Sequence, residues 1–529
     1  MDHNSLRFQP HTPETLAVAR LVLDEVRAGH KVLEAIRHHP LPGGGYLSKS
    51  MLVSAYRQIT ESGDLSFDPA FLARIRMKPV RTLSGVTTVT VLTKPYACPG
   101  KCIFCPTDVR MPKSYLPDEP GAMRALQHEF NPYDQVAARL QALVAVGHPT
   151  DKVELLILGG TWSSYRRDYQ EWFVRRCFDA MNGFTSTTLA EAQLANETAA
   201  QRNVGLVIET RPDHVDPAEL AWLRYLGVTK VQMGAQSLDD RILELNQRGH
   251  SVADTHKAVA LLRSAGFKIV LHWMPNLLGA TLASDRLDFA KLWTDLCPDE
   301  IKIYPTQLLA NADLYAYWQR REYHPYTTDE LIHLLADIKP TIPRYCRVNR
   351  VIRDIPSTHV VEGNRRTSLR QDAQLEMSRR GTRCQCIRCR EVRSQEIHPG
   401  RLHLEEEVYQ AGGSEEHFTS YVTPDDKLAG FLRLSLPGED SPQTGFVDLQ
   451  GAAIIREIHV YGQSLQVGAE VSGAAQHIGV GTRLIRHAEQ TALSHGYQRL
   501  AVISAVGTRQ YYLDRGFGRG ELYLVKFLS

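Results

Sequence analysis

The sequence of 529 residues predicts an α/β protein of several domains: a partial (βα)6 barrel, a smaller C-terminal α+β domain and a helical N-terminal module. Two patterns predict this organisation. From residue 83 to 305, six short runs rich in β-branched residues alternate with segments of helical periodicity, as in a parallel sheet that is open or curled into a partial barrel. After residue 427, further strand patterns surround a glycine-containing turn that opens a helix.

The composition excludes several other classes of protein. Hydrophobic residues make up 43% and charged residues 23% of the chain, which is typical of globular proteins and excludes collagen, coiled coil and general disorder. No apolar stretch reaches the roughly 18 residues of a membrane span, and we expect no signal peptide, transit peptide or anchor. Six of the nine cysteines lie in two tight clusters, which favours metal binding in a reducing, cytoplasmic environment over disulfides.

Residues 1–75 predict a small, basic helical module. Thr12 and Pro13 are typical of a helix start, and Gly29 of its end. Residues 76–340 hold the barrel pattern, in which the strand runs span residues 87–93, 153–159, 204–210, 228–234, 267–273 and 300–304. Ligands of such folds bind at the carboxyl ends of the strands, so the active site is expected there.

The net charge of +2 conceals an uneven distribution of charge. Residues 341–393 hold 13 basic and five acidic residues, and all 13 basic residues are arginine. Guanidinium groups suit bidentate contacts to phosphate and stacking on bases, so this block predicts a nucleic-acid partner. The alternative is a solvated surface with partners within the chain. The candidate nucleic-acid contacts are Arg344, Arg347, Arg365, Arg366 and Arg370.

A Pro/Gly-rich loop after the first predicted strand carries Cys98, Cys102 and Cys105. A structural zinc site, which is the alternative, normally needs four protein ligands, whereas three thiolates on a 4Fe-4S cluster leave one iron open for S-adenosylmethionine. The spacing and its place after the first strand resemble the radical S-adenosylmethionine superfamily. The resemblance implies that these cysteines hold the cluster and that reductive cleavage of S-adenosylmethionine gives a 5′-deoxyadenosyl radical.

Polar residues and glycines recur at the ends of the next predicted strands. Gly159 and Gly160 end the second strand, and Thr161 stands where the superfamily often has a glutamate, which puts the expected carboxylate contact in doubt. Glu209 lies near the end of the third strand and Gln232 in the fourth. All five are candidate cofactor contacts, although each polar side chain could instead be satisfied inside the fold.

The second cysteine cluster, Cys384, Cys386 and Cys389, lies inside the arginine-rich block. Three closely spaced thiols are typical metal ligands, and we favour structural zinc. The candidates for the fourth ligand are His398, Cys346 and water. A second iron–sulfur cluster is the alternative, because thiolate ligands alone do not choose the metal.

The C-terminal pattern is a strand, a Gln-x-x-Gly-x-Gly turn, a helix, a strand and a Tyr-Tyr pair. A glycine-containing turn that opens a helix presents free N–H groups to a pyrophosphate. The order resembles the GCN5-related N-acetyltransferases, which implies acetyl-CoA binding, with Tyr512 near the coenzyme sulfur, Tyr511 as the second option, and aromatic packing as the alternative for either. The candidate contacts are Glu457, Ile458, His459, Val460, Gln476, Gly479, Val480, Gly481, Thr482, Tyr511 and Tyr512.

A radical module joined to an acetyltransferase module by a basic segment resembles the Elongator catalytic-subunit family, whose members modify tRNA. Stretches that carry the resemblance include residues 151–154, 208–212, 246–250, 302–305 and 457–462. Through the first of these, Lys152 is a candidate acetyl-CoA contact; a surface lysine is the alternative. The resemblance divides the chain into residues 1–75 (tRNA-binding), 76–340 (radical barrel), 341–393 (metal-binding linker) and 394–529 (acetyl-CoA domain). The cysteine spacings indicate a prokaryotic-type member that works without Elongator partners or as a homodimer.

The family implies carboxymethylation of a tRNA wobble uridine. A deoxyadenosyl radical takes a hydrogen atom from the acetyl group of acetyl-CoA, the carbon radical adds to carbon 5 of the uridine, and hydrolysis releases CoA. An anionic tRNA suits the arginine block, and a reactive radical needs an enclosed cleft. The alternatives are a protein lysine acetyltransferase with a structural cluster and a tRNA-binding scaffold without turnover.

Overall fold

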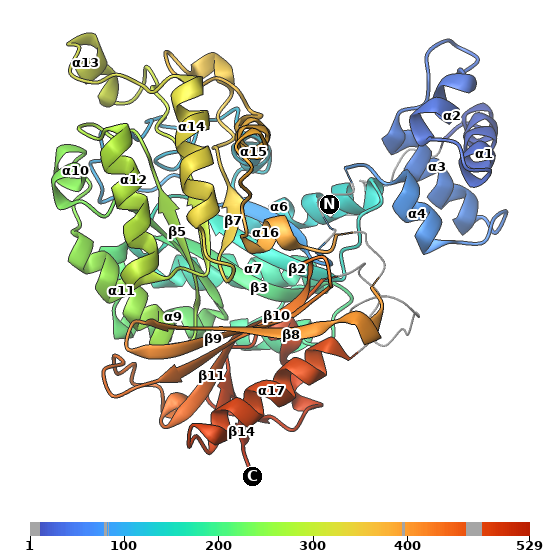
Figure 1. Ribbon diagram of the computed structural model, residues 1–529. Helices are drawn as coiled ribbons and strands as arrows, with labels where there is room; N and C mark the ends of the chain where they lie inside the picture. Colours follow the sequence, from blue (N-terminus) through green and yellow to red (C-terminus); the bar gives the residue numbers. More distant parts are fainter. Residues whose placement is uncertain (1–10, 79–81, 83, 394–396, 462–478) are drawn as a thin grey trace.

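The computed structural model describes residues 11–78, 82, 84–393, 397–461 and 479–529. It contains three parts: a helical module, a parallel half-barrel and a mixed sheet, of which the last two pack directly on each other (Figure 1). No helix in the described ranges is long and apolar enough to span a membrane.

The N-terminal module is a group of four helices that stands to one side of the barrel (Figure 1). The helices are α1 (Pro13–Arg27), α2 (Val32–His38), α3 (Lys49–Glu61) and α4 (Pro69–Ile75). Thr12 caps α1 by accepting a hydrogen bond from the N–H of Thr15, with Pro13 at the first helical position, as the sequence predicts. The module has a hydrophobic core of its own, built from residues of α1 to α4.

The barrel contains seven parallel strands, which lie side by side in chain order. The first six confirm the predicted runs: β1 (Thr87–Leu92), β2 (Lys152–Leu158), β3 (Arg202–Thr210), β4 (Lys230–Gln236), β5 (Lys268–Trp273) and β6 (Glu300–Ile303). The seventh, β7 (Arg347–Arg350), pairs in parallel with β6 and comes from the arginine-rich block. The sequence pattern missed it, because only Val348 among its four residues is apolar. This block therefore completes the half-barrel.

Helices cover the outside of the barrel. On β2, Val153, Leu155 and Ile157 are buried against this helical layer, whereas the alternate residues face the interior of the barrel. The barrel helices are α5 (Pro120–Gln127), α6 (Pro132–Ala145), α7 (Arg167–Asn182), α8 (Leu189–Asn196), α9 (Pro217–Leu226), α10 (Asp240–Leu245), α11 (Val252–Ser264), α12 (Leu282–Lys291), α13 (Leu314–Gln319) and α14 (Thr328–Ile338). Two more, α15 (Leu369–Arg379) and α16 (Ile387–Arg390), follow β7.

The C-terminal domain is a seven-stranded mixed sheet in the order β13-β14-β12-β11-β10-β9-β8. Its elements are β8 (His403–Ala411), β9 (Ser414–Val422), β10 (Leu428–Pro437), β11 (Ala452–Val460), α17 (Val480–Ser494), β12 (Arg499–Val502), α18 (Arg509–Leu513), β13 (Gly518–Arg519) and β14 (Leu524–Phe527). Only β11 and β12 pair in parallel, and α17 lies against β10 and β11. The strand patterns predicted after residue 427 include β10 and β11.

Buried ion pairs fix the C-terminal sheet to the amino ends of the barrel strands. Asp299, next to β6, lies 2.7 Å from the guanidinium of Arg456 and 3.4 Å from that of Arg433, and all three side chains are at most 1% exposed. Arg263 of α11 pairs with Glu416 of β9 at 3.2 Å. One hydrophobic core also runs from the barrel helices into the C-terminal sheet. The two domains therefore share an interior.

Candidate functional site

One cavity of about 1610 Å³ extends through the barrel from the first cysteine loop to the C-terminal domain. Cys105 borders it at the carboxyl end of the strands, and Tyr511 and Thr482 border it at the opposite end. Inward-facing residues of all seven barrel strands lie between these ends. The two predicted cofactor sites therefore open into the same enclosed space.

The three cysteines of the first cluster lie together on the loop after β1. A Cβ atom placed on Gly100 would lie 3.6 Å from the sulfur of Cys98 and 3.5 Å from that of Cys102, so Gly100 lies between these sulfurs, and the same Cβ would meet Arg211 at 2.5 Å. Cys105 contacts Cys102 through a thiol hydrogen bond. Three convergent sulfurs around an open space are what a 4Fe-4S cluster with one free iron requires.

Two arginines supply positive charge beside these sulfurs. Arg248 donates a hydrogen bond to Cys102 at 3.4 Å. Arg211 is held by a bidentate pair with Asp213, which leaves its buried Nη1 without a hydrogen-bond partner among the described residues. The hydrogen bond with Cys105, together with both guanidinium groups, lowers the pKa of the Cys102 thiol to about 5. Cys102 thus favours the thiolate, the form that binds iron, whereas the hydrogen bond with Cys102 and burial raise the pKa of the Cys105 thiol.

The end of β2 lies against the cysteine loop, as predicted. Gly159 and Gly160 have backbone φ angles of 145° and 89°, which residues other than glycine rarely adopt. The hydroxyl of Thr161 lies 3.8 Å from the sulfur of Cys98. Thr161 therefore brings a neutral polar group, not a carboxylate, to this side of the site.

Glu209 and Gln232 lie on adjacent strands and are joined through His272 of β5. The two ring nitrogens of His272 lie 3.4 Å from Glu209 and 3.1 Å from Gln232. Lys302 donates a further hydrogen bond to Gln232. Burial, and to a lesser extent Arg350, lowers the pKa of Lys302 to about 8. This amine can therefore hold or release a proton near neutral pH.

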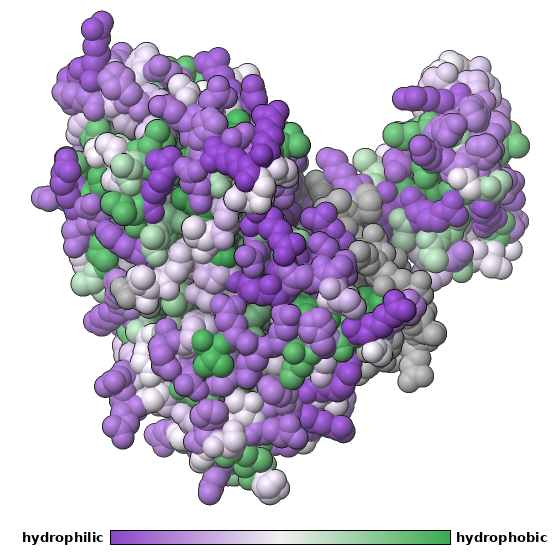
Figure 2. Space-filling model, in the orientation of Figure 1, coloured by the Kyte–Doolittle hydropathy of each residue, from purple (hydrophilic) through white to green (hydrophobic). Residues whose placement is uncertain are grey.

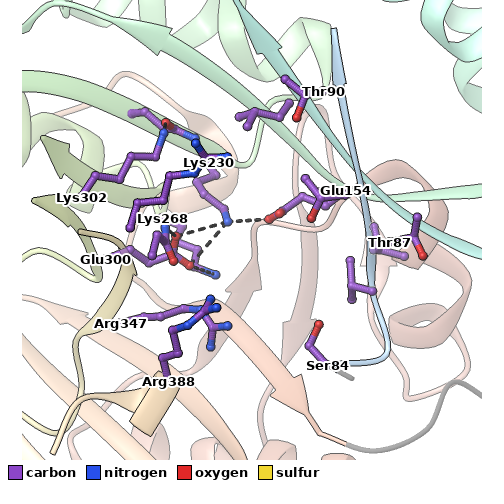
Figure 3. A pocket seen from close by; sticks show the side chains of 18 of the residues that line it. Ser84, Thr87, Thr90, Glu154, Lys230, Lys268, Glu300, Lys302, Arg347 and Arg388 are labelled. Atoms are coloured by element: carbon purple, nitrogen blue, oxygen red, sulfur yellow. Dashed lines mark hydrogen bonds and ion pairs between the residues drawn. The ribbon is translucent and has the colours of Figure 1, made fainter. Parts of the chain in front are cut away.

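A second charged group crosses the amino end of the barrel (Figure 3). Lys230 pairs with Glu154 at 2.5 Å and with Glu300 at 3.4 Å, and Lys268 pairs with Glu300 at 2.8 Å. Lys268 also pairs with Glu457 of β11. Lys152, the first residue of β2, lines the same end, and burial lowers its pKa. These groups form the polar wall that faces the C-terminal domain.

Strand β11 has an open edge next to the cavity. It pairs with β12 only from Ala452 to Ile455, whereas its pairing with β10 continues to Val460. The pairing with β12 therefore stops before residues 456–459, which lie beyond the part of β11 that the described residues of β12 cover. Ile458, His459 and Val460 border the cavity, and the ring of His459 stacks on Phe431.

The helix α17 begins at this open edge. Gly479 is its N-cap, with a φ angle of 70°, and Val480 anchors the first turn in the core. Gly481 faces the hydroxyl of Tyr511, and Thr482 accepts a hydrogen bond from Arg515 at 3.2 Å. The helix terminus thus presents N–H groups to the cavity. Gln476, also predicted here, lies outside the described residues.

The two adjacent tyrosines both border the cavity. Tyr512 is buried edge-to-face against Phe517, and burial raises its pKa well above the usual value. Tyr511 packs under the guanidinium of Arg515 at 3.6 Å and lies next to the first turn of α17. Both tyrosines therefore lie at the end of the cavity that is next to the first turn of α17.

Glu457 differs from the other predicted acetyl-CoA contacts in its surroundings. It accepts hydrogen bonds from Lys268 and from Arg433, at 2.9 Å in the second case. Burial alone would raise its pKa, but these two cations lower it to about 2. The side chain of Glu457 therefore links β11 to the barrel. Only the backbone groups of Glu457 belong to the open edge of the strand.

The second cysteine cluster forms a separate site beside β7. The sulfurs of Cys384, Cys386 and Cys389 all lie within 4.8 Å of one another. Lys339 has a fully buried side chain whose Nζ has no hydrogen-bond partner in the described ranges, and its charge acts on all three thiols. The three sulfurs lie close together, whereas His398, a candidate for the fourth ligand, is exposed.

The predicted nucleic-acid contacts fall into two groups. Arg344 pairs with Glu405 and Asp426, Arg347 pairs with Glu391, and Arg370 donates to a backbone oxygen of β7. Arg365 and Arg366, in contrast, are exposed. The surface over α15 and α16 is strongly hydrophilic (Figure 2). Residues of the arginine-rich block also border the cavity: Arg347, Arg350, Arg353, Arg370, Arg388 and Arg393.

Sequence reasoning gave no role to three residues that the fold brings to the site, Arg248, His272 and Lys302. Arg248 and Lys302 lie in stretches that carry the family resemblance, which was the available signal. His272 lies in an apolar strand run. Its role depends on neighbours 40 and 63 residues away.

Family models match most of the chain. The radical SAM superfamily matches residues 93–292, the radical SAM C-terminal domain residues 298–379, and the acetyltransferase (GNAT) family residues 387–517. The tRNA uridine(34) acetyltransferase of Dehalococcoides mccartyi is 42% identical over 85% of this chain and 99% of its own. The tRNA uridine(34) acetyltransferase of Methanocaldococcus jannaschii is 39% identical over 96% of this chain and 95% of its own.

More distant relatives and a solved structure agree with these matches. Elongator complex protein 3 of Homo sapiens is 36% identical over 87% of each chain. A structure of the archaeal Methanocaldococcus infernus Elp3 with an N-terminal deletion aligns with a TM-score of 0.74 and 36% identity, over 84% of this chain and all of that one. The chain therefore belongs to the family of tRNA uridine(34) acetyltransferases and Elongator complex protein 3, with a radical SAM half-barrel and an acetyltransferase domain.

Proposed function

We propose that this chain carboxymethylates carbon 5 of the wobble uridine of tRNA, with acetyl-CoA as the donor of the two-carbon unit. The observation that carries the proposal is the single cavity that joins the first cysteine loop to the turn before α17. This cavity gives a radical generated at one end a direct path to an acetyl group that the coenzyme carries in from the other.

The cysteine loop, the Gly159–Gly160 turn and the two neighbouring arginines fit a 4Fe-4S cluster and S-adenosylmethionine. When bound, this pair would supply the deoxyadenosyl radical that removes a hydrogen atom from the acetyl methyl group, and would take back the electron released as the uridine C5 proton leaves. Arg248 and Arg211 offset the charge of the thiolates. Gln232, His272 and Lys302 hold polar groups between the two ends of the cavity.

At the other end, the first turn of α17 supplies N–H groups for the pyrophosphate of acetyl-CoA. The open edge of β11 supplies backbone groups for the pantetheine amides. We assign Tyr512 to the region of the coenzyme sulfur, with Tyr511 as the alternative, because both border the cavity next to this edge. Lys152 adds a cation to the wall opposite.

The tRNA is proposed to approach over the arginine-rich block. Arg365 and Arg366 are exposed and offer phosphate contacts, whereas Arg370 and Arg347 line the cavity that the uridine must enter. Arg344 pairs with acidic residues of the C-terminal domain and is assigned a structural role.

The test of this function is anaerobic incubation of cluster-reconstituted protein with tRNA, acetyl-CoA, S-adenosylmethionine and a reductant, followed by nucleoside mass spectrometry. We expect 5-carboxymethyluridine with the wild type and none with Cys102→Ala. Absence of the product, although electron paramagnetic resonance shows an intact cluster, would refute the proposal. Acetyl transfer to a peptide that Cys102→Ala does not diminish would instead indicate a protein lysine acetyltransferase.

We also propose that Cys384, Cys386 and Cys389 hold a structural zinc ion. Three thiolates on Zn²⁺ leave one negative charge, which the buried ammonium of Lys339 balances. Zinc analysis of the wild type and of Cys386→Ala tests this assignment. Loss of iron instead of zinc in the variant would assign a second iron–sulfur cluster to the triad.

A further inference from the structure

A group of histidine and glutamate side chains lies on the outer part of the C-terminal domain, away from the cavity. Glu415 and His417 point from β9, and His495 lies directly after α17. The ligand atoms of these three residues all lie within 4.8 Å of one another. None of the three lines the cavity that joins the two cofactor sites.

The spacing of these atoms matches a metal coordination sphere. Oε1 of Glu415 lies 3.0 Å from Nε2 of His417 and 3.3 Å from Nε2 of His495. Zinc bonds to imidazole nitrogen and carboxylate oxygen are about 2.0–2.2 Å long, so ligand atoms of a tetrahedral site lie about 3.3–3.6 Å apart. The two carboxylate–imidazole separations are therefore within a few tenths of an ångström of those in a tetrahedral site, and the ligand atoms of the two histidines lie within 4.8 Å of each other.

The outer hydrogen bonds orient both imidazoles toward this ion. His495 donates from Nδ1 to the backbone oxygen of Thr491 at 2.8 Å, which leaves Nε2 as its ligand atom. Nδ1 of His417 lies 3.2 Å from a carboxylate oxygen of Glu406. Histidines that bind metals almost always direct their other ring nitrogen to a carbonyl or carboxylate in this way. Such partners make the site more than a chance surface cluster.

The two carboxylates of this group, Glu406 and Glu415, lie against histidines, which are the side chains that can also bind a metal ion. Glu406 and Glu415 pair only with histidines: within the described residues, no lysine or arginine forms an ion pair with either carboxylate. His417 is 5% exposed, while the side chains of Glu415 and His495 are 34% and 42% exposed. The site is thus anchored on one side and open to solvent on the other, so that water can complete the coordination.

We propose that Glu415, His417 and His495 form a zinc site with one open coordination position. Two imidazoles and one carboxylate are a donor set of zinc enzymes, and the same set also binds Fe²⁺. The ion would join β9 to the C-terminal end of α17, the helix whose N-terminus faces the acetyl-CoA end of the cavity. The site is distinct from both cysteine clusters in position and in ligand type.

The experiment uses the full chain, purified anaerobically, with its iron–sulfur cluster reconstituted and the cysteine triad already loaded with metal. Zn²⁺ is added at buffered free concentrations, and bound zinc is measured by mass spectrometry after gel filtration. We expect one additional Zn²⁺ per chain in the wild type and its loss in His495→Ala and Glu415→Gln. Glu406→Gln should weaken this binding by about 10–100-fold, because it removes the orienting carboxylate.

The matched control is His403→Ala, which removes an exposed histidine that also pairs with a glutamate but lies outside the group. It should keep the additional zinc. X-ray absorption at the zinc edge should show only nitrogen and oxygen neighbours for the added ion. Equal zinc binding by wild type, His495→Ala and Glu415→Gln, or sulfur neighbours around the added ion, would overturn the proposal and leave an ion-pair network only.

Discussion

Asp299→Asn tests whether buried ion pairs hold the acetyltransferase domain on the barrel. Asp299 is fully buried and contacts Arg456 through three oxygen–nitrogen pairs of 2.7–3.0 Å. It also lies 3.4 Å from Arg433 and accepts a hydrogen bond from the N–H of Ile269 at 2.8 Å. The substitution removes the negative charge with almost no change in volume, so cavity formation does not contribute to the result.

Removal of one partner from a buried ion pair costs about 3–5 kcal/mol. We expect the lower end, about 3 kcal/mol, because each arginine keeps a second carboxylate: Glu416 at 3.5 Å from Arg456 and Glu457 at 2.9 Å from Arg433. Urea unfolding followed by circular dichroism measures the difference. The matched control is Asp64→Asn, which breaks an exposed pair with Arg20 and should cost at most about 1 kcal/mol. A loss for Asp299→Asn no larger than that of the control would refute the role of this interface.

Three further predictions follow from the site. Gly100→Ala places a methyl group 2.5 Å from a guanidinium nitrogen of Arg211 and between the sulfurs of Cys98 and Cys102, so the iron and sulfide bound per chain should fall. The control Gly43→Ala, whose methyl group would meet nothing within 4 Å, should leave both amounts unchanged. Folding lowers the pKa of Glu457 from 4.5 to about 2, so its contribution to the free energy of unfolding is fully present above about pH 4.5 and is lost as the pH falls toward 2. This prediction is contradicted if the free energy of unfolding of Glu457→Gln falls as steeply with pH in this window as that of the wild type. Replacing Arg365 and Arg366 with Ala should weaken tRNA binding. The slope of the logarithm of the binding constant against the logarithm of the salt concentration should become shallower by up to about 0.7–0.9 for each phosphate that is no longer neutralised. An unchanged slope in filter binding would place the binding surface elsewhere.

Local patterns predicted the parts of the fold that depend on neighbouring residues. The first cysteine cluster was recognisable because its three ligands lie within eight residues, and the first six barrel strands because their apolar runs are nearly continuous. Strand β7 was not predicted, because three of its four residues, Arg347, Asn349 and Arg350, are polar and line the charged cavity. In β7, the apolar run that is usual for a parallel strand is therefore absent.

Long-range pairing explains the other missed features. Glu457 was predicted as a coenzyme contact from its place in a strand; the ion pair that its side chain forms with Lys268, 189 residues earlier in the chain, leaves no local sequence signal. The arginine-rich block read as a linker with a nucleic-acid surface, yet Arg344 and Arg347 face carboxylates from other segments. A charge count along the chain cannot distinguish an arginine that meets a phosphate from one that meets a glutamate.

The continuous interior of the barrel and the C-terminal sheet has a consequence for how catalysis is organised in time. Opening the two domains against each other would leave Asp299, Arg433 and Arg456 buried without their partners, so such a hinge motion carries a high free-energy cost. If the proposed reaction takes place, the travelling parts are the uridine and the flexible arm of the coenzyme. Selectivity then depends on which molecules can enter one fixed chamber, and the order of their arrival becomes the point at which the enzyme can be controlled.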